Sequence, residues 1–221
     1  MATPAQDHYE MVRHSLFAKV DQLFRIGGNV GGDDLDAHQF VREAEAALRE
    51  FYRAYSCELV KTPEDVYYLS VQDESPFSTR ILSRLDMIVG KTLALIYFDP
   101  QTHSNLGHVP FETLLGALDL NPGREIVLIH AQIRSVDEEV ANKRLREDVR
   151  KSLARLGRLN FIRWDAYGDE IVPHKALLRF ADDVRTSAPS EQNLEHLIHA
   201  GTVVLGQGDA VLPEGEDDEE A

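Results

Sequence analysis

The stretch LREDVRKSLARLGRLNFIRWDAYGDEIV, residues 145–172, contains two patterns that decide the fold. In its first part apolar residues recur every three or four positions, the spacing of one buried helical face: Leu145, Val149, Leu153 and Leu156. In its second part, from residue 160, short apolar runs flank a Tyr-Gly-Asp turn, which predicts two strands of a hairpin. The stretch therefore predicts an amphipathic helix over roughly residues 137–157, followed directly by a tight hairpin.

The N-terminal half repeats this order of elements. Helical spacing predicts a helix over residues 16–24, and the following GGNVGG, residues 27–32, is interpreted as a helix stop and turn. Asp33 or Asp34 can cap the next helix, whose apolar positions run from Phe40 to Tyr55. CELVKTPEDVYYLSV, residues 57–71, then predicts two short strands around a TPED turn.

Between the two hairpins, the polar stretch QDESPFSTR separates the halves. A helix over roughly residues 78–98 is so broadly apolar that we expect it to be buried on most sides. A loop, residues 99–110, and a short helix, residues 110–118, follow it. Residues 121–137 fit a strand or a helix equally well, and residues 174–185 fit a helix or a strand with a helix.

Two successive units of helix, helix and hairpin predict a mainly α fold with small β-hairpin wings, an α+β class built as tandem winged-helix domains. We place the N-terminal domain at residues 1–75 and the C-terminal domain at residues 76–185. Residues 186–221 are expected to form a linker, a short amphipathic helix and an acidic disordered tail.

Composition favours a globular protein of a reducing compartment. The 221 residues are 43% hydrophobic and include one cysteine, Cys57, which excludes an internal disulfide framework and which we expect to be buried. No apolar run has the length of a signal peptide core or of a membrane span. We therefore expect a cytoplasmic protein with no membrane contact.

Motifs of known catalytic chemistry are absent from the sequence. It contains no G-x-x-x-x-G-K-[ST], G-x-S-x-G, C-x-x-C or H-E-x-x-H. The pairs His103 with His108 and His196 with His199 lack cysteine or carboxylate partners at ligand spacing, so we interpret them as surface histidines. The sequence thus predicts no catalytic residue, no cofactor and no metal: the protein is not an enzyme.

Basic residues gather on the helix of the opening stretch. Residues 142–158 hold seven Lys or Arg against two acidic residues, although the whole chain has a net charge of -15. In a winged helix this element is the recognition helix, and the following hairpin is the wing. We therefore predict contact with DNA phosphates, the alternative being a solvated helix face. The predicted contact residues are Lys143, Arg146, Arg150, Lys151, Arg155, Arg158 and, on the wing, Arg163.

The equivalent helix of the N-terminal half lacks this excess, because Glu43, Glu45 and Glu50 stand among its arginines. One winged helix is thus expected to face DNA and the other a protein. The last 13 residues, 209–221, contain seven acidic residues and no basic one. A solvated tail is the simpler interpretation, and competition with DNA for a basic surface is the alternative.

Three segments carry a resemblance to a known family: residues 33–69, residues 81–100, and residues 145–164 with LLRFADDVR at 177–185. They are similar to the MukE family, the tandem winged-helix subunits of bacterial MukBEF condensins. The similarity runs from about residue 20 to residue 185, and LSRLDMIVGK, residues 82–91, is its most specific part. MksE, the counterpart in MksBEF systems, is the close alternative.

The resemblance implies a non-enzymatic, nucleoid-associated subunit that forms a homodimer and binds the kleisin MukF directly. Through MukF it would join the SMC ATPase MukB and help to clamp double-stranded DNA, without sequence specificity, for chromosome condensation and segregation. Which faces bind the kleisin and which bind the second copy stays open. Alternatives are an MksE-type subunit of a condensin or anti-plasmid system, or a winged-helix transcription regulator. The regulator is disfavoured because the exposed face carries Lys, Arg, Glu and Asp rather than base-reading Asn or Gln.

Overall fold

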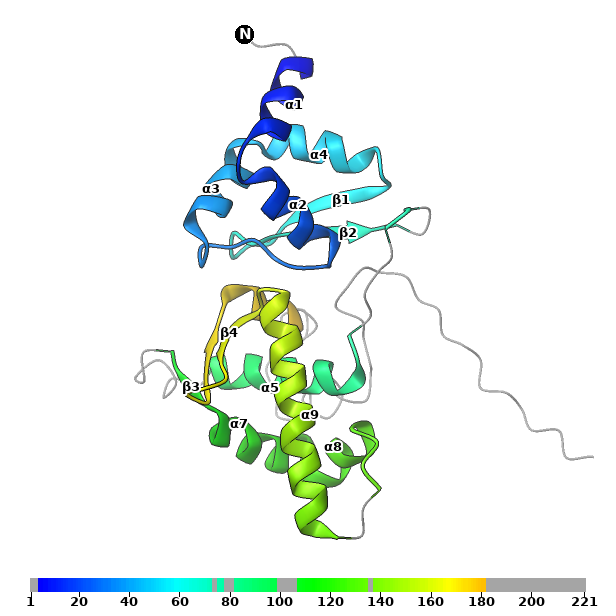
Figure 1. Ribbon diagram of the computed structural model, residues 1–221, viewed down its shortest axis with the longest axis vertical. Helices are drawn as coiled ribbons and strands as arrows, with labels where there is room; N and C mark the ends of the chain where they lie inside the picture. The colour runs from blue at the N-terminus through cyan, green and yellow to red at the C-terminus, as the bar shows by residue number, and fades with distance from the viewer. Residues whose placement is uncertain (1–3, 73–74, 78–81, 99–106, 135–136, 182–221) are drawn as a thin grey trace, which may run out of the picture.

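Figure 1 shows the computed structural model, which describes residues 4–72, 75–77, 82–98, 107–134 and 137–181. The N-terminal half contains the helices α1 (Pro4–Arg13), α2 (Phe17–Arg25), α3 (Leu35–Glu43) and α4 (Glu45–Arg53), and the strands β1 (Cys57–Lys61) and β2 (Tyr67–Val71). The C-terminal half contains α5 (Arg84–Phe98), β3 (Val109–Pro110), α7 (Phe111–Leu118), a π-helical turn (Asp119–Gly123), α8 (Arg124–His130), α9 (Glu138–Arg158), β4 (Ile162–Asp165), β5 (Glu170–Pro173) and a 3-10 helix (Lys175–Ala181).

The predicted fold class is confirmed: both halves place an antiparallel hairpin directly after an amphipathic helix. β1 pairs with β2 from Cys57 opposite Val71 to Lys61 opposite Tyr67. β4 pairs with β5 from Ile162 opposite Pro173 to Asp165 opposite Glu170. These hairpins are the two small wings of a mainly helical molecule (Figure 1).

Four local predictions need correction or completion. The helix expected through residues 40–55 is two helices, because Ala44 leaves the helical region (φ -94°, ψ 10°). Backbone bonds from Ala44 N to Phe40 O and from Leu48 N to Ala44 O span this bend, so the apolar spacing continues across it and gives no signal. Residues 124–130, left open between strand and helix, form α8, and residues 175–181 form the 3-10 helix. The expected loop, residues 99–110, ends in β3, which is too short to show alternation and pairs with β5.

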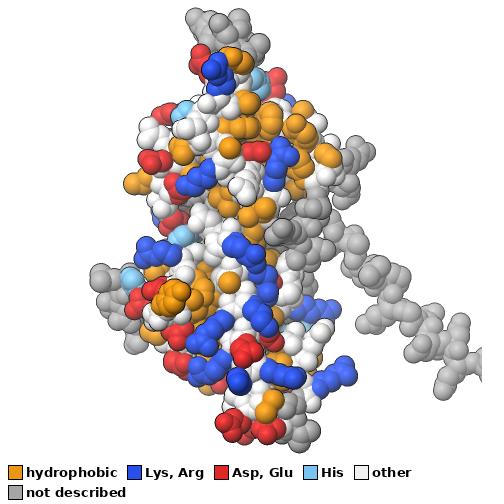
Figure 2. Space-filling view, in the orientation of Figure 1, with side chains coloured by type: hydrophobic (Ala, Val, Ile, Leu, Met, Phe, Trp, Pro, Cys, Tyr) orange, Lys and Arg blue, Asp and Glu red, His pale blue; other side chains and the backbone are white. Residues whose placement is uncertain are grey.

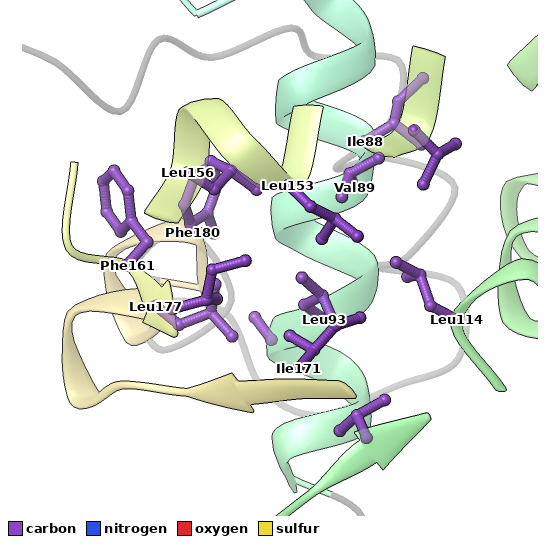
Figure 3. Packing of buried hydrophobic residues seen from close by; sticks show 14 of the residues in the cluster. Ile88, Val89, Leu93, Leu114, Leu153, Leu156, Phe161, Ile171, Leu177 and Phe180 are labelled. Carbon is purple, nitrogen blue, oxygen red and sulfur yellow. The ribbon is translucent and has the colours of Figure 1, made fainter. Parts of the chain in front are cut away.

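The buried side chains form two clusters. One lies in the N-terminal half and includes Phe24, Tyr52 and Tyr67. The other surrounds α5, where side chains from α5, α7, α9, β5 and the 3-10 helix converge (Figure 3). All four residues of the predicted apolar stripe on α9 are buried in this second cluster. The domain boundary at residue 75 stays a prediction, since Val66 of the N-terminal half also joins that cluster.

A buried polar junction joins the two halves. Asn29, in the turn that the sequence presented only as a helix stop, is fully buried. Its backbone N and its Nδ2 donate to the carbonyl of Leu159, at 3.0 and 2.8 Å, and its own carbonyl accepts from Asn160 Nδ2 at 2.9 Å. The guanidinium of Arg179 donates to Asn29 Oδ1 and lies 3.4 Å from the ring centroid of Tyr68. Since buried polar groups need partners, these bonds fix where the halves meet.

Two glycines in helices provide a test of the packing. A Cβ on Gly90 of α5 would lie 2.5–2.8 Å from ring atoms of Phe180, whereas one on Gly116 of α7 would meet nothing within 4 Å. We expect Gly90→Ala to lower the free energy of unfolding by about 1–3 kcal/mol through overpacking. Gly116→Ala should raise it by up to about 1 kcal/mol, because alanine favours the helix. Urea unfolding measures both, and a neutral Gly90→Ala would contradict the packing of Phe180 on α5.

Candidate nucleic-acid interface on helix α9

Helix α9 presents two different faces. Its N-terminus is capped by Asp137, whose Oδ1 accepts from the backbone N of Glu139 and of Val140, at 2.9 and 3.2 Å. Its leucine face packs on α5, and the opposite face carries the basic residues. Figure 2 shows Lys and Arg side chains gathered over α9 in the lower part of the molecule. The predicted basic surface therefore exists, although its members differ in their surroundings.

Two of the predicted contact residues, Arg146 and Arg150, form ion pairs with other elements near the surface. Arg146 donates to both carboxylate oxygens of Glu112 on α7, at 2.6 and 2.7 Å, and this guanidinium lowers the pKa of Glu112. Arg150 donates to Asp169 in the turn between β4 and β5, at 3.0 and 3.1 Å. Its guanidinium also lies 4.6 Å from the ring centroid of Phe111. These two arginines connect α7 and the wing to α9 through ion pairs that are partly exposed to solvent.

Lys151 pairs within its own helix, with Nζ 2.7 Å from Asp148 Oδ1. Its side chain stays 65% exposed. Exposed pairs of this kind contribute little, because water and salt screen them. The ammonium group of Lys151 is thus still accessible to a ligand.

Arg155 has a structural role. Its Nε and Nη2 lie 2.7–3.0 Å from the carboxylate oxygens of Asp86 on α5, a residue only 2% exposed. Ser152 Oγ donates to the same carboxylate at 2.6 Å. Burial raises the pKa of Asp86, but the hydrogen bonds from Arg155 and its neighbours outweigh it, so the pKa lies below its usual value. Arg155 is therefore committed to joining α9 to α5.

Lys143, Arg158 and Arg163 are exposed and have no carboxylate partner among the residues that the structure describes. Arg144 shares this state, although it was not among the predicted contact residues. We call these four side chains the free cations. Lys143 and Arg144 lie in the first half of α9, and Arg158 ends the helix about 22 Å further along, from 1.5 Å per residue. Arg163 follows on β4. The sequence predicted that basic residues gather on this helix, and the structure shows which of them have a carboxylate partner.

An open groove of about 870 Å³ lies beside Arg163, between the start of α3 and the wing. One wall carries Asp33, Asp34 and Asp36, and the other carries Arg163 and Trp164. The aspartates give this wall a negative charge that disfavours phosphates, although Asp34 is paired with Lys19. The groove therefore borders the basic surface of α9 on the side of Arg163.

The sequence also led to predictions about metal binding, the histidine pairs, Cys57 and membrane spans. Within the described ranges, no group of three or more His, Cys, Asp or Glu is placed to hold a metal. His108 lies 3.1 Å from Glu170, while His103, His196 and His199 fall outside those ranges. Cys57 is buried, as expected. None of the helices in the described part of the chain has the length and apolarity needed to cross a membrane.

Comparison with known proteins gives a consistent result over nearly the whole chain. The model of the MukE-like family matches residues 6–221. The chromosome partition protein MukE of Photorhabdus laumondii is 29% identical over 218 residues, which cover 95% of this chain and 91% of the relative. Proteins of the same name from Escherichia coli and Vibrio vulnificus are 31% and 32% identical, and this chain covers 86% and 82% of their lengths.

The buried pair of Asp86 with Arg155 leads to a prediction on acid stability. Asp86→Asn should lower the free energy of unfolding by roughly 3 kcal/mol at pH 7, because it leaves Arg155 without its partner. The folded pKa of Asp86 lies below the unfolded value of 3.8, so the contribution is present above pH 3.8 and is lost as the pH falls through the folded pKa. Urea unfolding at pH 7 and pH 3 should thus show a smaller difference between variant and wild type at pH 3.

Glu112→Gln serves as the control, since Glu112 is a 67% exposed partner of Arg146. It should cost less than about 1 kcal/mol at pH 7. Equal losses in the two variants would contradict the structural role of the Asp86 pair.

Proposed function

The chain belongs to the MukE-like family, and on that premise we propose that it acts in chromosome partition as a non-enzymatic subunit of a bacterial SMC condensin. In this proposal it binds the kleisin MukF directly and reaches the SMC ATPase MukB through it, in the cytoplasm at the nucleoid. The support is a family match that leaves out only the first five residues. An MksE-type subunit of an MksBEF system is the alternative.

The DNA part of the proposal depends on one observation: the free cations on α9 and β4 have no carboxylate partner among the described residues, while neighbouring arginines on the same helix have one. A cation without a partner is available to neutralise a phosphate and release its counterion. The exposed positions of α9 carry Lys, Arg, Glu, Ala and Val, and the amide of the helix, Asn142, is half-buried and accepts a hydrogen bond from Arg124 instead of reading a base. Such contacts position DNA without reading its sequence, which suits a clamp better than a transcription regulator.

The proposal narrows the seven predicted contact residues. Arg155 is paired with the buried Asp86, and Arg146 and Arg150 are each paired with a carboxylate of a neighbouring element. We assign the phosphate contacts to Lys143, Arg158 and Arg163, with Arg144 beside them and the weakly paired Lys151 between them.

A charge-reversal pair tests this assignment. Arg158→Glu with Arg163→Glu should weaken DNA capture by the complex assembled with the kleisin, the SMC partner and ATP, about equally for all sequences. The slope of log K against log salt should fall by about one for each lost contact. Filter binding over a salt series measures both quantities.

Arg42→Glu with Arg53→Glu is the matched control, because both arginines are exposed in the N-terminal half and the change in net charge is identical. The control should retain DNA capture. If both pairs lose it equally, net charge alone is responsible and α9 is a solvated face. Unchanged thermal unfolding and kleisin binding exclude a folding defect.

We also propose that the isolated chain is a homodimer. The broad apolar surface of α5 is used largely within the chain, since Val89 and Leu93 are buried, so it does not by itself require a second copy. The proposal instead follows from the family. Light scattering at micromolar concentration should give twice the mass of 24.9 kDa, and a clean preparation should not hydrolyse ATP. A monomer, or ATP turnover, would contradict this prediction.

A further inference from the structure

The free cations raise the question of what they contact when no DNA is bound. We propose that the acidic C-terminal segment of this same chain, residues 209–221, binds Lys143, Arg144, Arg158 and Arg163. If the proposed DNA contact holds, the segment also competes with DNA for this surface. The contact between the segment and α9 does not depend on that function and can be tested without DNA.

Charge distribution is the first argument. The chain has 38 acidic residues against 23 basic ones, so carboxylates outnumber cations. Other cations of α9 have a carboxylate partner, for example Glu112 for Arg146 and Asp169 for Arg150. The free cations have no such partner among the described residues, and all four lie on α9 and the strand that follows it. The segment 209–221 is their complement, with seven acidic residues and no basic one.

Position and reach are the second argument. The 3-10 helix ends at Ala181, one residue after Phe180, whose ring centroid lies 4.9 Å from that of Phe161. The backbone N of Phe161 in turn donates to Leu156 O in the last turns of α9. The 27 residues from 182 to 208 span up to about 90 Å when fully extended, and α9 is only about 30 Å long. The acidic segment can therefore reach every free cation.

Covalent linkage makes weak pairing sufficient. Each exposed ion pair contributes little and is screened by salt. A tethered segment, however, has an effective concentration near its target on the order of millimolar. A DNA duplex, which carries many phosphates, would displace it. The acidic segment would thus compete with weak or short polyanions for the free cations, while a long polyanion such as a DNA duplex would displace it.

Zero-length carbodiimide cross-linking of the full chain, without DNA, tests the contact. An amide should form between Lys143 Nζ and an acidic residue of 209–221, and it should disappear at high salt. Lys143→Arg keeps the charge but has no reactive amine, so this cross-link should be lost. Lys61, which pairs with Asp65 on the N-terminal half, is the control lysine. Tail cross-links to Lys61 as frequent as those to Lys143, or none to Lys143, would overturn the inference.

DNA binding by the assembled complex tests the competition. Glu216→Gln, Asp217→Asn and Asp218→Asn together should tighten binding at low salt by at least about threefold, with no difference at high salt. Glu10→Gln, Glu43→Gln and Glu58→Gln change the net charge equally on the exposed N-terminal half and should have no such effect. The gain should also vanish when Arg158 and Arg163 are reversed to Glu.

The two proposals fail in different ways. If the arginine reversals weaken DNA capture but the tail variant behaves like its control and Lys143 gives no tail cross-link, the tail contact is wrong and the proposed function stands. If the cross-link forms while the reversals leave DNA capture unchanged, the contact stands and the DNA role of α9 is wrong.

Discussion

The buried ion pair of Asp86 with Arg155 is the interaction on which the C-terminal half depends. Asp86 also closes the N-terminus of α5, because its Oδ2 accepts from Ser83 N while Ser83 Oγ accepts from Asp86 N. One carboxylate thus begins α5 and aligns α9 with it. This alignment buries the leucines of α9 on α5 and leaves the charged face of α9 exposed. The free cations are therefore exposed because of a buried ion pair elsewhere on the same helix.

The junction of the halves rests on the end of that same helix. Asn29 binds the backbone just after α9, and Arg179 supports Asn29 from the 3-10 helix. The contacts are polar and buried, so they are directional, and a shifted arrangement of the halves would leave several of these groups unpaired. The acidic start of α3 is thereby held beside the wing, where the groove bounds the cationic surface.

Periodicity predicted most of the fold, because the leucine stripe of α9 and the two hairpins are local patterns. It could not predict the bend at Ala44, across which the spacing continues, or β3, whose two residues have partners at least sixty positions away. The basic helix was also predicted as a cluster. The sequence did not predict which members of this cluster are paired and which are free. The carboxylates of Glu112 and Asp86 come from distant elements, and such pairing cannot be seen in the spacing along α9.

The contact of Phe180 with α5 limits how the sequence can evolve. Gly90 leaves no room for a methyl group under the Phe180 ring, so neither position can change size independently. If position 90 gains a side chain first, the ring at position 180 is in the way until a smaller residue replaces it. If position 180 becomes smaller first, a void opens next to Gly90. These two sites, ninety positions apart, should therefore change together during evolution. The easier order is a smaller residue at position 180 first, followed by a side chain at position 90 that fills the void.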